Sequence, residues 1–241
     1  MIKLFRKIRQ NLLAENLPGR QAGKFSKYLM YAIGEIILVV IGILIALSIN
    51  NWNEGRINKI KEQEYLEGIK TDLQSDLNYI DILLPNYKSR IQRYATLDSL
   101  VRVRSTKIFD IDVSEIASLT HQMATLYPRK GSYSSLISDN STGLITNKEL
   151  LKELKGMYEV GYVRVLLLGQ ELDDISTQIK WETRFDFRQN LKGFTFEDFD
   201  RLFANLEILD RNVRKYNERL YSLLERINQR IALIEQELNK R

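Results

Sequence analysis

Cysteine is absent from the 241-residue chain, and proline is scarce, with three residues. The lack of cysteine excludes structural disulfides, thiolate nucleophiles and cysteine-ligated zinc. Three prolines and twelve glycines are few enough to permit long uninterrupted helices. Histidine occurs once, as His121, so the chain also lacks the usual ligands of a zinc site.

Familiar catalytic motifs are missing as well. The sequence contains no HExxH, P-loop or GxGxxG motif, and no ExxH pair for a helical carboxylate metal site. A Ser-His-Asp triad could use only His121, which we expect to be a surface or packing residue on a helix. The acidic pairs at 173–174 and 197–198 are typical of solvated helix faces or helix N-termini. We therefore expect no catalytic residue, metal or cofactor, and no enzyme.

The basic character of the chain is confined to its beginning. The net charge is +5 and the pI about 9.2. Residues 1–27 contain seven basic residues and one acidic residue, a net charge of +6, whereas the remainder contains 29 basic and 30 acidic residues, a net charge of −1. The larger part of the chain has no positive excess to attract phosphates, so we expect no nucleic-acid partner.

An apolar stretch follows the basic segment. Residues 32–49 read AIGEIILVVIGILIALSI, and Tyr28, Tyr31 and Trp52 flank them, as aromatic residues do at membrane interfaces. With its flanks the stretch reaches about 20 residues, roughly 30 Å of helix, enough to cross a bilayer. We predict a transmembrane helix over 28–51. The positive-inside rule places 1–27 in the cytoplasm and 52–241 in the periplasm.

Two other interpretations of this stretch are weaker. A cleaved signal peptide could end near Ala46-Leu47-Ser48, but the apolar run is too long and begins too late. A buried core helix would rarely be so uniformly apolar between basic and aromatic flanks.

Three residues within the predicted span could contact another helix. Glu35 is the only charged residue in 32–49, and it either lies near the cytoplasmic headgroups or contacts a partner. Gly42 and Ala46 form a small-xxx-small pair, which permits close helix packing and a homo-oligomer. Residues 2–13 are expected to form a basic amphipathic helix on the inner membrane surface or a disordered tail.

The apolar stretch and its surroundings carry a family resemblance. The sequence KFSKYLMYAIGEIILVVIGILIALSINNWNE, residues 24–54, closely resembles the opening of a bacterial domain-of-unknown-function family, number 6090. The opening IKLFRKIRQNLL and the later SLISDNSTGLITNKELLKEL are similar to the same family. The resemblance implies a single-pass envelope protein of Gram-negative bacteria, and it supplies no activity, catalytic residue or cofactor.

The rest of the chain has the three-four apolar spacing of amphipathic helices. We predict helices over 54–84, ended by Pro85, then over 86–103 and over 112–126, the last opened by Asp112 with Glu115. A long helix follows a capping box of Thr146 with Glu149, and a final helix covers 206–238. The phenylalanine-rich residues 183–200 connect these two. The expected fold is all-α, an extracytoplasmic bundle whose long helices could instead form an intermolecular coiled coil.

Residues 128–146 differ from the helical segments because they are rich in serine, glycine and asparagine. Such polar segments on a rigid scaffold are frequent binding sites, although an ordinary connection plugged by Leu136 and Ile137 is the simpler interpretation. The expected contact residues are Arg129, Lys130, Tyr133, Ser135, Asp139 and Asn140.

Three functions are compatible with these patterns. The first is a membrane-anchored interaction or scaffold protein of the cell envelope. The second is a sensor-like or transport-accessory protein whose outer helical domain binds a ligand. The third, least favoured, is an enzyme with a carboxylate-based site, which a deep pocket with converging acids would support.

Overall fold

The computed structural model describes residues 21–121, 123–183, 191 and 193–240. Regular structure within these residues is entirely helical, which confirms the all-α prediction. The elements in chain order are α2 (Gln21–Arg102), η1 (Thr106–Asp110), α3 (Val113–Thr120), α4 (Gly131–Ser138), η2 (Ser141–Leu144), α5 (Lys148–Lys155), η3 (Gly156–Gly161), α6 (Tyr162–Thr183) and α7 (Phe196–Asn239). The chain divides into two compact units, Met1–Ile57 and Asn58–Arg241, so α2 contributes to both.

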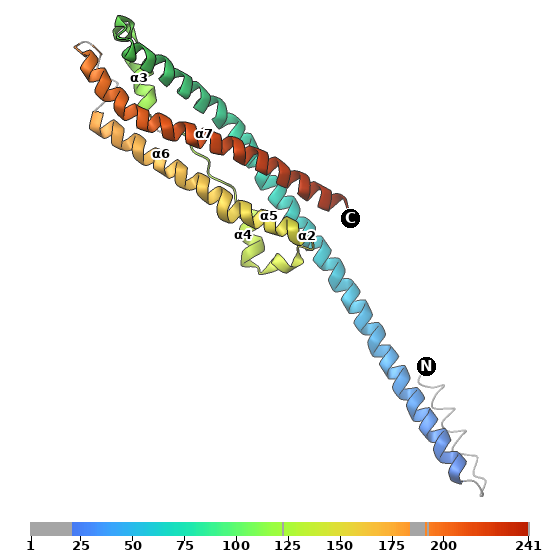
Figure 1. Cartoon of the computed structure of the whole chain (residues 1–241). Helices are drawn as coiled ribbons and strands as arrows, with labels where there is room; N and C mark the ends of the chain where they lie inside the picture. Colours follow the sequence, from blue (N-terminus) through green and yellow to red (C-terminus); the bar gives the residue numbers. More distant parts are fainter. Residues whose placement is uncertain (1–20, 122, 184–190, 192, 241) are drawn as a thin grey trace. The chain divides into compact units, whose positions relative to one another are not determined.

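The described part of the first unit is the beginning of α2, drawn in blue in Figure 1. Every side chain from 28 to 57 is exposed, including the long run of isoleucine, leucine and valine. This stretch is long and apolar enough to cross a membrane, and the Cβ of an alanine at position 42 would meet no atom within 4 Å. An apolar surface of this size is unfavourable in water, and here it is free to contact lipid or another helix.

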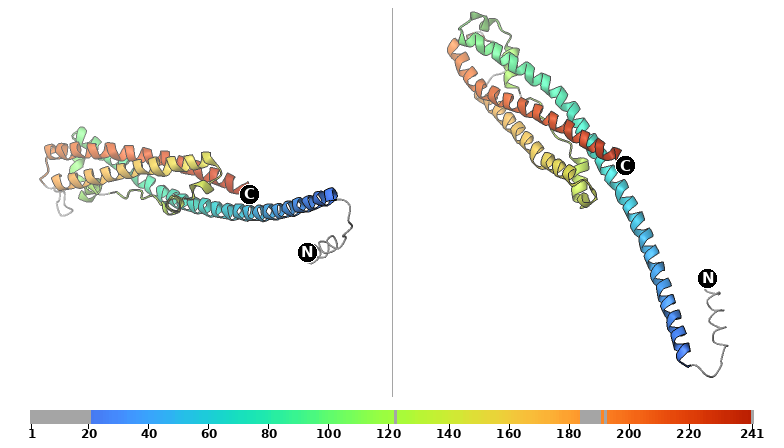
Figure 2. Two further views of the ribbon diagram at one scale, coloured as in Figure 1. Left: turned by 90° about the horizontal axis from the view of Figure 1, so that it is seen from below. Right: turned by 45° about the vertical axis from the view of Figure 1, so that its right-hand side comes forward.

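The second unit is a bundle of three long helical segments (Figures 1 and 2). They are the remainder of α2, the continuous α5–η3–α6 segment, and α7. Each buries an apolar stripe at three-four spacing, the frame that the sequence predicts. On α7 the fully or almost fully buried side chains include Phe199, Leu206, Leu209, Val213, Tyr216, Leu220, Leu223, Ile227 and Ile234.

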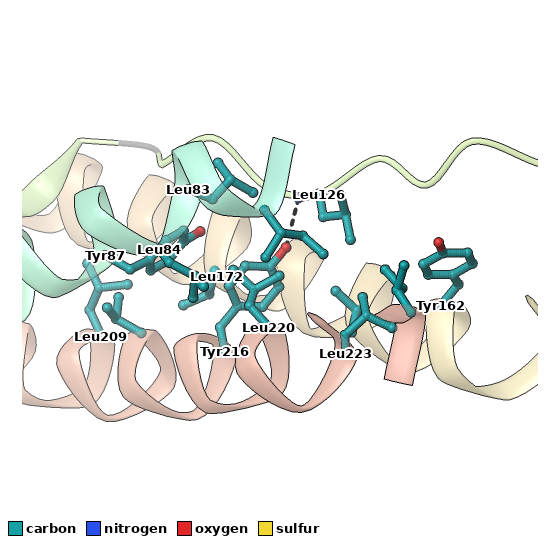
Figure 3. Close-up of a cluster of buried hydrophobic side chains, with 14 of the residues drawn as sticks. Leu83, Leu84, Tyr87, Leu126, Tyr162, Leu172, Leu209, Tyr216, Leu220 and Leu223 are labelled. Carbon is teal, nitrogen blue, oxygen red and sulfur yellow. Dashed lines mark hydrogen bonds between the residues drawn. The ribbon is translucent and has the colours of Figure 1, made fainter. Parts of the chain in front are cut away.

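Large aromatic residues join the helices in the middle of the core (Figure 3). The rings of Tyr87 on α2 and Tyr216 on α7 lie 5.2 Å apart. The Tyr216 hydroxyl accepts a hydrogen bond of 2.8 Å from the main-chain NH of Leu126. This bond satisfies a buried NH on the segment that runs between α3 and α4, so it fixes that segment to the bundle.

Pro85 does not end the first helix, contrary to the prediction. The helix continues to Arg102 and absorbs the segment expected to be separate. Pro85 and Asp81, the residue one turn earlier, both lie on the exposed face, so the carbonyl that loses its donor faces solvent. Leu83, Leu84 and Tyr87 are buried around it, and their packing outweighs the cost of the proline.

Other boundaries differ by a few residues. The Asp112 side chain caps α3 by accepting from the NH of Ser114, not by a capping box with Glu115, and α3 ends at Thr120 instead of continuing to 126. The N-cap of α5 is Asn147, not Thr146. The Thr146 hydroxyl instead donates to Glu62 on α2, at 2.9 Å.

The last helix begins earlier than expected. Thr195 and Asp198 form a capping box that starts α7 at Phe196, so the acidic pair at 197–198 belongs to a helix N-terminus. Two phenylalanines of the expected connection 183–200 pack on Phe109, whose ring centroid lies 5.0 Å from that of Phe196 and 5.6 Å from that of Phe199. Two others, Phe185 and Phe187, lie outside the described residues.

Candidate functional site

The expected recognition segment 128–146 is partly helical, forming α4 and η2. The N-cap of α4 is Lys130, whose side chain makes no capping hydrogen bond. Carboxylates from α2 accept the hydrogen bonds that an N-cap side chain would otherwise accept. Asp72 accepts from the NH of Ser132 at 2.9 Å, and Asp76 accepts from the NH of Arg129 at 3.1 and 3.2 Å. These bonds satisfy orphan donors and place negative charge at the positive end of α4.

Gly68 allows α4 to approach α2 closely. A Cβ at position 68 would lie 2.8 Å from the Ser132 side-chain oxygen and 3.1 Å from its Cβ. Glycine inside a helix costs about 1 kcal/mol relative to alanine, so its presence here needs a packing reason. The approach of Ser132 provides that reason.

Three tyrosines, Tyr133, Tyr158 and Tyr162, form a cluster that packs α4 against η3 and α6. The rings of Tyr133 on α4 and Tyr158 on η3 stack 4.2 Å apart and nearly parallel, and Tyr162 meets Tyr158 edge-on at 5.2 Å. The Tyr133 hydroxyl donates to Glu159 at 2.7 Å. Tyr158 and Glu159 both belong to the π-helical η3, a wide turn that often occurs at functional sites.

Asp76 is the central polar group beneath this cluster. It is buried at 1 % exposure and accepts a hydrogen bond of 2.6 Å from the Tyr162 hydroxyl. Burial raises the pKa of Asp76, although the hydrogen bonds from Tyr162 and Arg129 oppose this change. Burial also raises the pKa of the Tyr162 hydroxyl, so the tyrosine remains a neutral donor. Asp76 therefore holds the Tyr162 side chain and the main chain at Arg129 in place.

A groove of about 590 Å³ lies between α2 and the α4–η2 segment. Its lining includes Lys61, Glu64 and Tyr65 from α2, and Ser135, Asp139 and Ser141 from the other side. The Tyr65 hydroxyl donates to Asp139 at 2.7 Å, so a hydrogen bond links the two sides of the groove. Hydroxyls, carboxylates and one ammonium group give this groove the chemistry of a site for polar backbone or side-chain groups. We name these six residues the α4 groove.

The predicted contact residues occupy different positions. Ser135 and Asp139 line the α4 groove, and Asn140 is exposed in the left-handed conformation with φ of 52°. Arg129 is exposed beside Asp76, and Lys130 is half-buried. Tyr133 is buried at 6 % exposure within the tyrosine cluster. Of the predicted plug, Leu136 is buried, whereas Ile137 is 41 % exposed.

The α2 side of the site was not predicted from the sequence. Glu62, Leu66, Ile69, Leu73, Asp76 and Ile80 continue one buried stripe, in which two positions are acidic. An acid at a core position of an apolar stripe needs buried hydrogen-bond donors, and here these are the Tyr162 hydroxyl and the backbone of 129 and 146. The two acids at buried-stripe positions, Glu62 and Asp76, are the feature of the sequence that could have indicated this side of the site.

The other expected sites remain separate from the groove. Glu35, Gly42 and Ala46 are exposed on the first unit. His121 follows the end of α3, not within a helix, and is half-buried. Among the described residues no group of three histidine or acidic side chains could hold a metal ion.

Comparison with protein families gives one match. Residues 35–206 match the model of a family described as Family of unknown function (DUF6090). The chain belongs to this family. The match includes most of the apolar stretch, both sides of the α4 groove and the π-helical segment. No curated protein and no solved structure matches the chain significantly.

Proposed function

We propose that the chain is a membrane-anchored cell-envelope protein that binds a partner protein through the α4 groove. The observation that carries this proposal is a short polar helix held rigidly on a bundle by two carboxylates, with an exposed apolar residue, Ile137, beside a polar groove. Protein interfaces combine apolar contacts with a polar rim in this way. The proposal includes no enzymatic activity.

The proposed anchor is the apolar stretch of α2. Its side chains are uniformly exposed, and the seven basic residues that precede it give the charge asymmetry of a cytoplasmic N-terminus. We propose a single span in the bacterial inner membrane with the bundle in the periplasm. Alkaline phosphatase fused to the C-terminus should then be active; an inactive phosphatase with an active cytoplasmic reporter would reverse the orientation.

Photo-crosslinking in cells tests the binding surface. A photoreactive amino acid replaces Ile137 in the full-length chain, and the matched control replaces Glu218, which is exposed on α7. We expect a discrete adduct from position 137 and none from 218. Adding Ser135→Trp, which fills the groove, should remove the adduct. Adducts that are equal at both positions, or that persist with the tryptophan, would contradict the proposal.

A small-molecule ligand is the second candidate, because the groove volume falls within the range of known ligand sites. The function would then be that of a sensor-like or transport-accessory protein. No adduct from position 137, together with protection of a Ser135→Cys variant from a maleimide by an added small molecule, would favour this alternative.

A further inference from the structure

A second cavity of about 200 Å³ lies on another part of the bundle, against the C-terminal half of α2 and the end of α3. Arg90, Arg93, Ser89 and Ser118 line it, together with Asn86 and His121. Its volume is below the range of drug-sized ligand sites, so it fits only a small group. No feature of the proposed function uses this cavity.

Arg90 is unusual because its guanidinium is buried without full hydrogen bonding. The residue is 5 % exposed, and Nη2 donates to the main-chain oxygen of Leu119. Neither Nε nor Nη1 has a hydrogen-bond partner among the described residues. Burial lowers the pKa of Arg90 to about 10, which still leaves it charged at neutral pH. A buried charge of this kind is costly unless an anion compensates it.

The neighbouring charges leave a positive excess. Asp210 on α7 is the acid that acts on Arg90, but its Oδ2 already accepts from Arg214 Nε at 2.6 Å. Arg93 adds a second guanidinium on the same side of α2, and its Nη1 donates to the Ser118 hydroxyl at 2.6 Å. That hydroxyl in turn donates to the main-chain oxygen of Glu115 at 2.6 Å. The other oxygen of Asp210, Oδ1, has no hydrogen-bond partner among the described residues, so this carboxylate offsets the Arg90 charge without a hydrogen bond to it. Arg90 and Arg93 are like charges that both line the cavity.

We propose that this cavity binds a small tetrahedral oxyanion, a phosphate group held by the guanidinium groups of Arg90 and Arg93 with the hydroxyl of Ser89. Arginine donates in a planar fork that matches the oxygens of phosphate, and the Ser89 hydroxyl adds a neutral donor beside the two guanidinium groups. The phosphate group comes either from the free ion or from a phosphate monoester. Both sources share the same contacts.

Calorimetric titration of the full-length chain in detergent micelles tests the site. Inorganic phosphate is added against chloride at equal ionic strength, and glycerol 3-phosphate is titrated in parallel. We expect saturable binding at one site. Arg93→Gln should weaken it about tenfold, the loss of one charged hydrogen bond. The matched control is Arg211→Gln, which removes an exposed α7 arginine paired with Glu207 at 3.7 Å and should leave binding unchanged.

Equal affinity for both probes identifies the free ion as sufficient, and tighter binding of the ester identifies an esterified phosphate; either result supports the site. Absence of saturable binding to both probes overturns the proposal, as does equal weakening by the two glutamine variants. If Arg93→Gln does not fold, Arg93→Lys keeps the charge and loses the planar fork. It should weaken binding less than tenfold but measurably, and unchanged affinity would again overturn the proposal.

Discussion

The two parts of α2 have the same backbone conformation and opposite patterns of burial. From 28 to 57 every side chain is exposed, although most of those before 50 are apolar. From Leu66 to Val101 apolar and exposed polar positions alternate with helical period, and the apolar stripe is buried. Around Leu83, Leu84 and Tyr87 it lies against α6 and α7 (Figure 3). The difference shows that helix formation says little about environment. The distribution of apolar residues around the helix determines which solvent each part requires.

Charged substitutions should prevent membrane insertion when they lie in the first part of α2 and should have no such effect in the second part. The variant Val40→Arg with Leu44→Arg places two charges at the centre of the apolar stretch, at a cost of roughly 5–7 kcal/mol for membrane insertion. We expect the chain to leave the membrane fraction. The matched variant Asn78→Arg with Ile82→Arg changes two exposed positions of the bundle and should fractionate normally. Equal fractionation of both variants would contradict the membrane assignment.

Removing an apolar side chain should reduce stability only where that side chain is buried in the bundle. Leu220 is completely buried in the core, and Leu220→Ala should reduce the free energy of unfolding by about 2–5 kcal/mol. Leu167 on α6 is 59 % exposed, and Leu167→Ala should change it by less than about 0.5 kcal/mol. Denaturant unfolding in micelles measures both. Similar losses would mean that the bundle core lies elsewhere.

Two helical glycines of α2, Gly55 and Gly68, should respond differently to alanine. Alanine at either position should gain about 1 kcal/mol of helix propensity. No neighbour lies within 4 Å of a Cβ at Gly55, whereas a Cβ at Gly68 would crowd Ser132. Overpacking costs about 1–3 kcal/mol, so Gly68→Ala should destabilise the bundle or loosen α4, as hydrogen exchange at 131–138 would show. Stabilisation by both substitutions would remove the packing reason for Gly68.

The smallest expected effect is the pH response of Asp76. Because burial raises its folded pKa above the unfolded value, the folded state binds the proton more tightly. The contribution of Asp76 to stability is therefore greatest at low pH and is lost as pH rises through the folded pKa.

Asp76→Asn should remove this pH dependence. The free energy of unfolding of the wild type, relative to Asp76→Asn, should fall as pH rises from the ordinary aspartate range toward neutrality. Asp81→Asn, at an exposed position, is the control. A difference that grows with pH would mean that the carboxylate is stabilised in its charged form.

The sequence was sufficient for the long amphipathic segments and insufficient where tertiary contacts override local rules. The stripe of α7 could be predicted because its apolar spacing continues from Leu206 to Leu238. The continuation through Pro85 could not, because it depends on the exposure of the carbonyl at Asp81 and on packing around Leu84. Local propensity is a weak guide when one side of a helix is buried.

The candidate site was half predictable. Its polar segment was evident from composition, and Ser135 and Asp139 line the groove. The carboxylates that hold α4, Asp72 and Asp76, lie about 60 residues earlier in the chain, and only folding brings them to the NH groups of Ser132 and Arg129. Likewise, nothing local marks Arg90 as buried beside the end of α3.

Cysteine scanning of α2 can show directly which positions of this helix face water, because the chain has no cysteine of its own. Single cysteines from 32 to 49 and from 62 to 101 are treated in intact membranes with a water-soluble maleimide. If 32–49 crosses the membrane, no position in it should be labelled, on any face of the helix. From 62 onward we expect protection at buried positions such as Ile69 and Leu73 and labelling at exposed ones such as Gln74. A three-four alternation of labelling within 32–49 would contradict the membrane span, because one face of that stretch would then be in water.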